Sequence, residues 1–480
     1  MGPQNLIYGG GVAESVVSPA VLAITLLTGL LIVFLPRKMV ILPFLALGIL
    51  IPIYQILVVG GLHFPMLRVL VLFGFARLVW AKISGRNRIF SGGMNGIDSA
   101  FLVLVVFTAV DGVLLWQTQG ALINQLGALY TSIGVYFLLR YLIRDEEDVR
   151  EALRSIVPVA VVLAASMTFE HFTGRNPFYE WLGGAHAQAF SSAIDRNGFL
   201  RARGSFAHPI IAGTFGGFMV PLFIGWWKRE KRDRKYAMLG ALCATIIPFD
   251  VGSSTALFGL LAGIGALWLW PMRRRLRMLR WGVVAFLIAG QLYSNTGVWH
   301  LIDDVSLADG SSSFHRYELV NQCIRHFWDW ALVGTKNYAS WGWDMWDLSN
   351  QFVATADTAG LIPLVAFIAI LVFGFRYIGR TRQHYEGDRQ HEFFIWAIGA
   401  SLFANMVSFM GTGYWDQIIV PWYMVLAIIS AVRVRAPRSA AVFVPEYNLP
   451  SSIAQAHSPS PRISGALANR PIGSWRRLSR

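Results

Sequence analysis

Two polar stretches of this chain place arginine residues next to the start of an apolar or amphipathic segment. In the first, Arg201 and Arg203 come shortly before Gly204 and Pro209, which break regular structure near the beginning of an apolar run. Backbone N–H groups at a helix start, combined with guanidinium groups, form a binding site for a phosphate or a diphosphate. In the alternative interpretation, both arginines only extend along the membrane surface to lipid headgroup phosphates.

The second stretch contains His315, Arg316 and Tyr317, which follow a run of serines suited to cap a helix. Apolar residues then recur at helical spacing, so we expect an amphipathic helix that lies on the outer membrane surface. Arg316 would fall in its first turn, where a bound anion would offset the unfavourable position of a cation. Alternatively, His315 and Arg316 form ion pairs with Glu318 or Asp329 and have no other role.

A third group, Trp346, Asp347 and Asn350, combines an indole ring with carboxylate and amide groups. Such residues suit sugar recognition, since ring faces stack on sugars and the hydroxyl groups need polar partners. Taken singly, each tryptophan is better explained by the aromatic belt of a membrane interface. Asp344 and Asp347 have no further ligand cluster beside them, so we expect no metal site. Asp347 and His208 are the two candidate bases for a reacting hydroxyl group.

Long apolar runs must hold these groups in place. Each is near the ~20 residues that a helix needs to cross a bilayer, although a few are short. We predict an all-α polytopic bundle of about 12–13 spans, at residues 17–35, 39–60, 64–81, 99–118, 122–143, 155–170, 208–227, 236–251, 254–271, 280–294, 356–378, 393–411 and 416–432.

The dense Lys and Arg clusters fall in every second gap between these runs, which assigns those gaps to the cytoplasm. The two longest remaining gaps, 171–207 and 295–355, therefore face outward, contain short surface helices and carry the arginines described above. Residues 1–434 form the bundle with these loops, and the N-terminus lies outside. Residues 435–480 are rich in Ser, Pro and Arg, and we expect them to form a disordered basic cytoplasmic tail.

The composition excludes several classes of protein. With 55% hydrophobic and 14% charged residues, the chain is typical of a membrane protein. Its net charge of +14 resides in short loops between spans, so attraction to anionic lipid explains it better than nucleic-acid binding. The two cysteines, Cys243 and Cys323, form neither a disulfide framework nor a zinc-site spacing. We expect no cofactor.

Within the predicted spans, Arg68 and Asp111 are costly to bury. Both fall toward the outer half of their spans, so they pair with each other or line a cavity open to the outside, and Asp250 could join them. A structural ion pair is the alternative, above all for Asp111, whereas Arg68 is a candidate substrate-binding residue.

Two stretches of sequence resemble the O-antigen ligase and O-antigen polymerase superfamily of bacterial membrane glycosyltransferases. The first is Arg201-x-x-Gly204-Ser205-Phe206-x-His208-Pro209, directly before a span. The second runs from His315-Arg316 through Leu332-Val333-Gly334 and Asp347-x-x-Asn350-Gln351-Phe352 to Ala359-Gly360-Leu361. The likeness covers residues 120–435 in layout and only these two stretches in residues.

The resemblance implies a metal-independent glycosyltransferase of the inner membrane that acts on undecaprenyl-diphosphate-linked glycans at the periplasmic face. By motif position, Arg201 and Arg316 would bind the diphosphate. We also expect the neighbouring Arg203, His315 and Tyr317 to contact the substrate. The chain has Ser349 before Asn350, where ligases of the family commonly carry a His-Asn pair. This departure favours an exopolysaccharide polymerase over a ligase.

Three functions remain open. A polymerase would use a second lipid-linked glycan as acceptor, whereas an O-antigen ligase would transfer the glycan to lipid A core. A transporter or flippase would instead need cations along a continuous path through the spans. The expected partners are the lipid-linked donor, the glycan acceptor, membrane lipids and proteins of polysaccharide export or chain-length control.

Overall fold

The computed structural model describes residues 15–84, 90, 92–183, 193–196, 198–293 and 312–433. Over these residues the chain is mostly helical and contains two short antiparallel hairpins, which confirms the predicted all-α polytopic class. The predicted tail 435–480 lies outside the described residues, as do parts of the loops 171–207 and 295–355.

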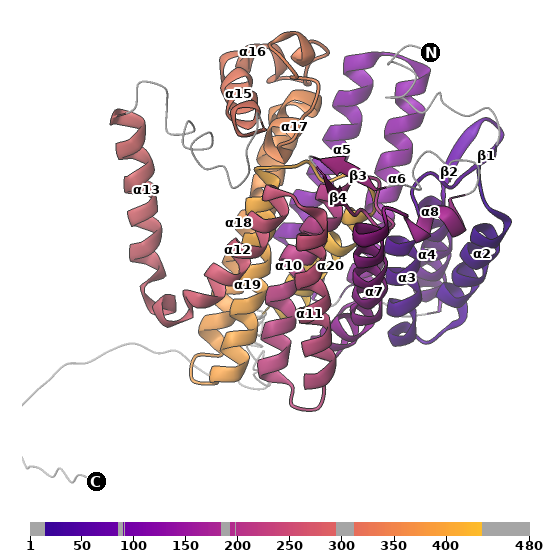
Figure 1. The fold of residues 1–480 in the computed structure, drawn as a ribbon, viewed down its shortest axis with the longest axis horizontal. Helices are drawn as coiled ribbons and strands as arrows, with labels where there is room; N and C mark the ends of the chain where they lie inside the picture. Colours follow the sequence, from indigo (N-terminus) through magenta and orange to yellow (C-terminus); the bar gives the residue numbers. More distant parts are fainter. Residues whose placement is uncertain are drawn as a thin grey trace, which may run out of the picture. The chain divides into compact units, whose positions relative to one another are not determined.

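Every predicted span overlaps a helix (Figure 1). By length and composition, six of the described helices could cross a membrane: α5, α6, α7, α10, α18 and α19. In chain order the helices that match the spans are α2 (Pro19–Phe34), α3 (Ile41–Leu50), α4 (Met66–Ile83), α5 (Gly96–Trp116), α6 (Gln119–Leu142), α7 (Glu146–Thr173), α10 (Pro209–Arg229), α11 (Arg234–Val251), α12 (Ser254–Trp268), α13 (Leu276–Tyr293), α18 (Leu361–His384), α19 (Arg389–Phe409) and α20 (Ile419–Val432).

Two predicted spans have wrong boundaries. The span 39–60 ends at Leu50, because Pro52 follows and residues 56–65 form a hairpin of β1 (Ile56–Val59) and β2 (Leu62–Pro65). The span 356–378 is interrupted at Gly360, which separates α17 (Gln351–Ala359) from α18 and has a φ of +87°. Apolar composition alone marked neither break.

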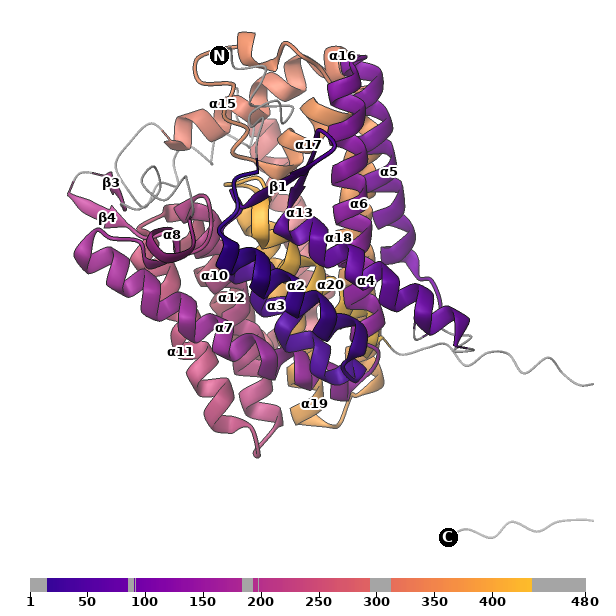
Figure 2. The same cartoon turned by 90° about the vertical axis from the view of Figure 1, so that its right-hand side faces the viewer.

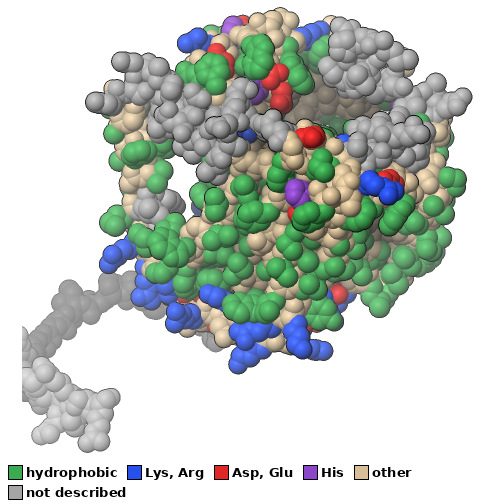
Figure 3. Space-filling view, in the orientation of Figure 1, with side chains coloured by type: hydrophobic (Ala, Val, Ile, Leu, Met, Phe, Trp, Pro, Cys, Tyr) green, Lys and Arg blue, Asp and Glu red, His purple; other side chains and the backbone are tan. Residues whose placement is uncertain are grey.

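The loops predicted to be cytoplasmic share one end of the bundle. Lys and Arg side chains gather there, beyond a flank of hydrophobic side chains (Figure 3). Ion pairs join loops that are far apart in the sequence: Arg37 with Asp148, Arg150 with Asp233, and both Arg273 and Arg382 with Glu392. The described gaps near residues 37, 148, 233, 273 and 390 therefore lie on one side, as the charge pattern predicted.

The opposite end carries α15 (Ser312–Arg325), α16 (Phe327–Trp330) and α17 (Figures 1 and 2). A small apolar cluster holds them together: Leu319, Cys323, Trp330, Met345, Val353 and Ala356. Helix α15 turns Leu319 and Cys323 toward α17 and the 341–348 segment, so part of the apolar stripe that we expected to lie on the membrane surface packs within the protein. Counting from Ser312, Arg316 falls in the second turn rather than the first.

Helix α10 is the packing centre on which the site is built. It contacts α7, α11, α12 and α19, and 83% of its apolar window is buried. Glycines let its neighbours approach closely: a Cβ on Gly216 would lie 2.5 Å from the Ala244 carbonyl oxygen, and one on Gly217 would lie 3.0 Å from the Leu260 backbone nitrogen. Small residues of this kind are what close helix contacts within a membrane require.

Candidate functional site

The stretch around Arg201 is bound to the end of α11. Strands β3 (Ile194–Arg196) and β4 (Phe199–Arg201) form a short hairpin that leads into it. The Arg201 Nε donates to the Val251 carbonyl at 3.1 Å, and the Ala202 backbone N–H donates to the Asp250 carbonyl at 3.0 Å. Arg201 is 7% exposed, so its guanidinium is fixed against the helix end instead of extending to lipid headgroups.

Glu170, near the end of α7, holds the turn that follows. One of its carboxylate oxygens accepts hydrogen bonds from the backbone N–H groups of Arg203 at 3.1 Å and Gly204 at 2.9 Å. The Asn176 side chain donates to the Gly204 carbonyl at 2.9 Å. Gly204 has a φ of +59°, and a Cβ there would lie 3.0 Å from Met167, so this position favours glycine.

His208 caps the N-terminus of α10. Its Nδ1 accepts a hydrogen bond from the Ile210 backbone N–H at 3.2 Å, so a neutral ring carries its proton on Nε2. Burial, and then the charges of Arg201 and Arg203, lower the pKa of His208 to about 4. At neutral pH the ring is therefore uncharged, and its Nε2 is a hydrogen-bond donor rather than a base.

Arg316 reaches the start of α12 from the other polar stretch. Its Nη2 donates to the Thr255 hydroxyl at 2.9 Å, and that hydroxyl donates to the Gly411 carbonyl at 3.2 Å. Arg201 and Arg316 thus bind residues 251 and 255, whose Cα atoms can be at most about 14 Å apart. The structure thus anchors the two predicted cations on residues four positions apart, at one helix–helix turn.

That turn has the features of an anion site. The first residues of α12 carry backbone N–H groups for which the helix offers no acceptor, and the helix dipole adds a partial positive charge. Two guanidinium groups stand beside it, from segments more than 100 residues apart. The combination suits a phosphate or diphosphate.

Asp347 lies beside the Arg316 segment. The His315 ring nitrogen Nε2 is 2.9 Å from the Asp347 carbonyl oxygen, which places the two segments in contact. The residue is exposed as a whole, but the protein around its carboxyl group and the nearby Asp344 raise the pKa of Asp347, against the opposing charges of His315 and Arg316. A carboxylate with a raised pKa is a better proton acceptor than an ordinary aspartate.

The remaining predicted residues are placed less centrally. The side-chain carbonyl oxygen of Asn350 accepts hydrogen bonds from the backbone N–H groups of Phe352 and Val353 and thereby caps α17. Trp346 is 70% exposed, and Tyr317 packs its ring 6.1 Å from that of Phe314. Asn350 therefore has a structural role that does not depend on a substrate.

Arg68 and Asp111 do not pair with each other, which corrects one of the two expectations for them. Arg68 donates from Nη1 to the His63 carbonyl at 2.9 Å and from Nε to the Thr131 hydroxyl at 3.3 Å. Asp250 accepts from the Thr168 hydroxyl at 2.7 Å. Arg68 does line a cavity, which is the other expectation.

Packing explains two segments of the second resembling stretch, around Gly334 and Gly360. The Leu361 backbone N–H donates to the Ala331 carbonyl at 2.9 Å, and the Thr335 N–H donates to the Asp357 carbonyl at 2.7 Å. Gly334, with a φ of +84°, and Gly360 each face the partner segment so closely that a Cβ would lie 2.7 Å from backbone atoms. These two motif segments join the outer helices to α18.

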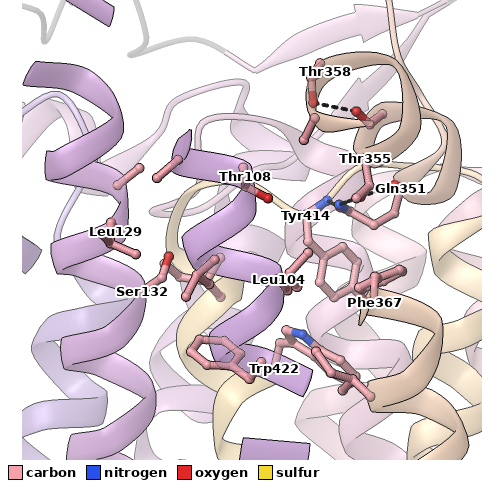
Figure 4. A pocket seen from close by; sticks show the side chains of 18 of the residues that line it. Leu104, Thr108, Leu129, Ser132, Gln351, Thr355, Thr358, Phe367, Tyr414 and Trp422 are labelled. Carbon is pink, nitrogen blue, oxygen red and sulfur yellow. Dashed lines mark hydrogen bonds between the residues drawn. The ribbon is translucent and has the colours of Figure 1, made fainter. Parts of the chain in front are cut away.

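An apolar cavity of about 230 Å³ opens between α5, α6, α17, α18 and α20 (Figure 4). Its lower walls include Leu104, Phe367 and Trp422, whereas Gln351 and Thr355 form a polar edge. The Gln351 side-chain oxygen accepts from the Tyr414 backbone N–H at 2.5 Å, which fixes that edge to the link between α19 and α20.

Sequence reasoning missed the turn between α11 and α12 and the carboxylate of Glu170. The sequence Ser253-Ser254-Thr255 between two apolar runs was an available signal, because such residues cap helices. Over the described part of the chain, no group of three or more His, Cys, Asp or Glu side chains could hold a metal ion.

A comparison with models of protein families finds no match to this chain, and a comparison with curated proteins finds none either.

Proposed function

We propose that this protein is a membrane glycosyltransferase that polymerises glycan units carried on a lipid diphosphate such as undecaprenyl diphosphate. The observation that carries the proposal is the meeting of Arg201 and Arg316 at the turn between α11 and α12. An anion held there would lie at the loop end of a bundle whose helices are apolar enough to cross a membrane. A lipid diphosphate combines the two required properties, an anionic headgroup and an apolar chain.

The proposed reaction needs little acid assistance. The oxygen of an acceptor hydroxyl bonds to the anomeric carbon of the donor sugar, while the bond from that carbon to the diphosphate oxygen breaks. The electron pair leaves with the diphosphate, and the hydroxyl proton passes to a base. Guanidinium groups aimed at the departing charge stabilise the transition state electrostatically. They supply the positive charge, so the proposal assigns no role to a metal ion.

Asp347 is the better supported base. Its pKa is raised, and the contact between His315 and its backbone keeps it beside the Arg316 segment. The His208 Nδ1 is already occupied by the cap of α10, so we assign His208 a different role: donating from Nε2 to the anionic substrate. This assignment separates two residues that the sequence alone treats as equivalent candidates.

The apolar cavity below the loops supports a lipid-linked substrate. It lies within the bundle and is lined mainly by side chains such as Phe101, Leu104 and Phe409. Its polar edge at Gln351 belongs to the same outer region as Asp347. We propose that the protein resides in a bacterial inner membrane with these loops facing the periplasm.

A reconstituted assay tests the function directly. The purified full chain in lipid vesicles is supplied with a defined lipid-diphosphate oligosaccharide. We expect the glycan to lengthen and free lipid diphosphate to be released in equal amounts. A parallel sample also receives lipid A core: transfer to it without lengthening would indicate a ligase instead, and the absence of any glycan transfer in either sample would refute the proposal.

A further inference from the structure

Residues 410–416, which link α19 to α20, run across the candidate site from one polar stretch to the other. At the start of the link, the Gly411 carbonyl accepts a hydrogen bond from the Thr255 hydroxyl, on which one of the two guanidinium groups is held. At its end, the Asp416 carboxyl group accepts a hydrogen bond from the Ala207 backbone N–H at 2.9 Å. The link is therefore anchored at both ends.

The middle of the link is held against the segment that follows the proposed base, Asp347. The Tyr414 backbone N–H donates to the Gln351 side-chain oxygen at 2.5 Å, and both residues are labelled in Figure 4. A Cβ on Gly413 would lie 3.6 Å from the Leu348 carbonyl oxygen. In the proposed reaction, the anomeric carbon lies between the diphosphate and the hydroxyl that the base activates. The sugar ring joined to the diphosphate should therefore lie over this link.

Trp415 presents an aromatic side chain on this link. The residue is 47% exposed, although its chain neighbours Tyr414 and Asp416 are both held by the hydrogen bonds given above. The centroid of its indole ring lies 6.5 Å from that of the His208 imidazole. The proposed function assigns the Nε2 of His208 to the anionic substrate, so an exposed indole stands next to a group that binds the anion.

This tryptophan differs from those of a membrane aromatic belt, which face the lipid at the rim of a protein. His208 caps α10, and α10 packs between α7, α11, α12 and α19. A ring beside His208 therefore lies over the interior of the bundle. In addition, the indole N–H of Trp415 donates to no acceptor within the described residues. Both the ring and its N–H are therefore available to a ligand in the site.

A flat ring with one polar edge suits a sugar. A pyranose carries C–H groups on its ring faces, which pack against an aromatic face, and hydroxyl groups at its edge, which need hydrogen-bond partners. The diphosphate gains nothing from the same face, because the face of an aromatic ring is its negative side and repels an anion. The contact therefore distinguishes the sugar from the diphosphate to which it is joined.

We propose that the exposed indole face of Trp415 stacks on the sugar ring joined to the diphosphate and orients its anomeric carbon for attack. The inference rests on the proposed glycosyltransferase function and names a sugar-binding residue within it. The contact ends when the glycan is transferred, whereas the arginine contacts to the diphosphate remain. Trp415 therefore favours binding of the glycosylated donor over binding of the released lipid diphosphate.

This preference can be measured without turnover. The full chain in detergent is titrated with undecaprenyl diphosphate, either bare or carrying one glucose, galactose or N-acetylglucosamine, and binding is followed by native mass spectrometry. Comparison of the bare and glycosylated lipids isolates the contribution of the sugar ring. Trp415→Ala removes the indole, and Trp415→Tyr keeps an aromatic face. Trp328→Ala is the matched control, because Trp328 is 86% exposed but belongs to α16, which packs against α17.

We expect the wild type and Trp328→Ala to bind at least one glycosylated lipid about 10-fold more tightly than the bare lipid, as one aromatic contact allows. Trp415→Ala should lose this preference and still bind the bare lipid as the wild type does, whereas Trp415→Tyr should keep most of it. Should Trp415→Ala fail to fold, Trp415→Leu takes its place, because leucine is apolar but has no ring face.

The proposal is overturned if the wild type does not prefer any glycosylated lipid, or if the preference survives in Trp415→Ala. It is also overturned if Trp415→Ala weakens the binding of both lipids equally, as a purely structural role of the ring would. These three results leave the anion site and the transferase proposal standing. If the wild type binds neither lipid, the transferase proposal fails together with the sugar contact.

Discussion

Arg201 and Arg316 show how single residues define this site. Each guanidinium is held by a hydrogen bond to the turn between α11 and α12, on the Val251 carbonyl and the Thr255 hydroxyl. A diphosphate that departs with two or three negative charges needs more than one cation in a cleft partly removed from water. The two residues should therefore act as a unit.

We expect Arg201→Ala and Arg316→Ala each to lower turnover on the order of 10²-fold while the protein still folds and inserts. Arg→Lys should restore little activity, because an ammonium group cannot reproduce the planar two-pronged contact. Arg325→Ala is the control, since that residue is exposed at the end of α15. The measurement is the rate of glycan lengthening in vesicles.

The double variant Arg201→Ala/Arg316→Ala decides whether the two residues share one diphosphate. A shared site predicts a combined loss clearly smaller than the product of the two single losses. Simple multiplication of the losses would argue for separate roles, and near-normal product formation by either single variant would refute the shared site.

Protonation of His208 should make the stability of the protein depend on pH. Its pKa is about 4 in the folded protein against 6.5 for an ordinary histidine, so only the unfolded chain takes up a proton between these values. Above pH 6.5, His208 contributes a constant amount to the free energy of unfolding. As the pH drops from 6.5 to 4, this free energy falls by about 1–3 kcal/mol.

The check compares the melting temperature of the wild type with that of His208→Asn from pH 7.5 to pH 4.5, in detergent. Asparagine is also a good N-cap, so the variant keeps the start of α10. The wild type should lose more stability on acidification than the variant. Parallel curves would show that His208 does not titrate in this range.

At the scale of elements, helix α10 supports the Arg201 stretch and the helices that pack against it. It begins at Pro209, directly after its cap His208, and packs along α11, α12 and α19 through glycine contacts. A side chain at such a position forces the helices apart, because the nearest atoms belong to the backbone of the partner helix.

We expect Gly216→Ala to destabilise the protein by about 1–3 kcal/mol, as overpacking does, because a Cβ there lies 2.5 Å from the Ala244 carbonyl oxygen. Gly265→Ala in α12 is the matched control, since a Cβ at that position meets no atom within 4 Å. Both changes favour helix by intrinsic propensity, so a loss of thermal stability confined to Gly216→Ala reports packing alone. Equal stability of the two variants would contradict this account of α10.

At the scale of the whole bundle, the described loops lie at two opposite ends. Ion pairs such as Arg37–Asp148 and Arg273–Glu392 hold one end together. At the other end, the loops are joined by contacts such as that of the Ala207 N–H with Asp416. Which end faces the cytoplasm is a prediction from the excess of Lys and Arg.

Single cysteines introduced at Ser340 and Arg232, both exposed, test that prediction. In intact cells, a membrane-impermeant thiol reagent should label the cysteine at position 340 and should spare the one at 232. The native Cys243 and Cys323 are buried, so the parent protein serves as the background control. Labelling at 232 in intact cells, with 340 reacting only after permeabilisation, would reverse the orientation and the side assigned to the site.

The sequence by itself determined the fold class, the approximate positions of the spans and the alternation of the loops. These depend on local quantities, namely apolar length and the placement of Lys and Arg, which the chain displays directly. It also singled out Arg201 and Arg316, because guanidinium groups at helix starts are chemically conspicuous. Their meeting at residues 251 and 255 depends on how α11 and α12 pack, and no local pattern contains that information.

Tertiary structure alone decided the roles of the polar residues. Asn350 was a candidate for substrate contact and His208 a candidate base, but the fold uses Asn350 to cap α17 and occupies the Nδ1 of His208 at the start of α10. Glu170 and Asp416 drew no attention as isolated acids, and they gain significance only through the backbone N–H groups of residues 203, 204 and 207. Hydrogen bonds between distant segments have no signature in a single sequence, because they form only when the helices have packed.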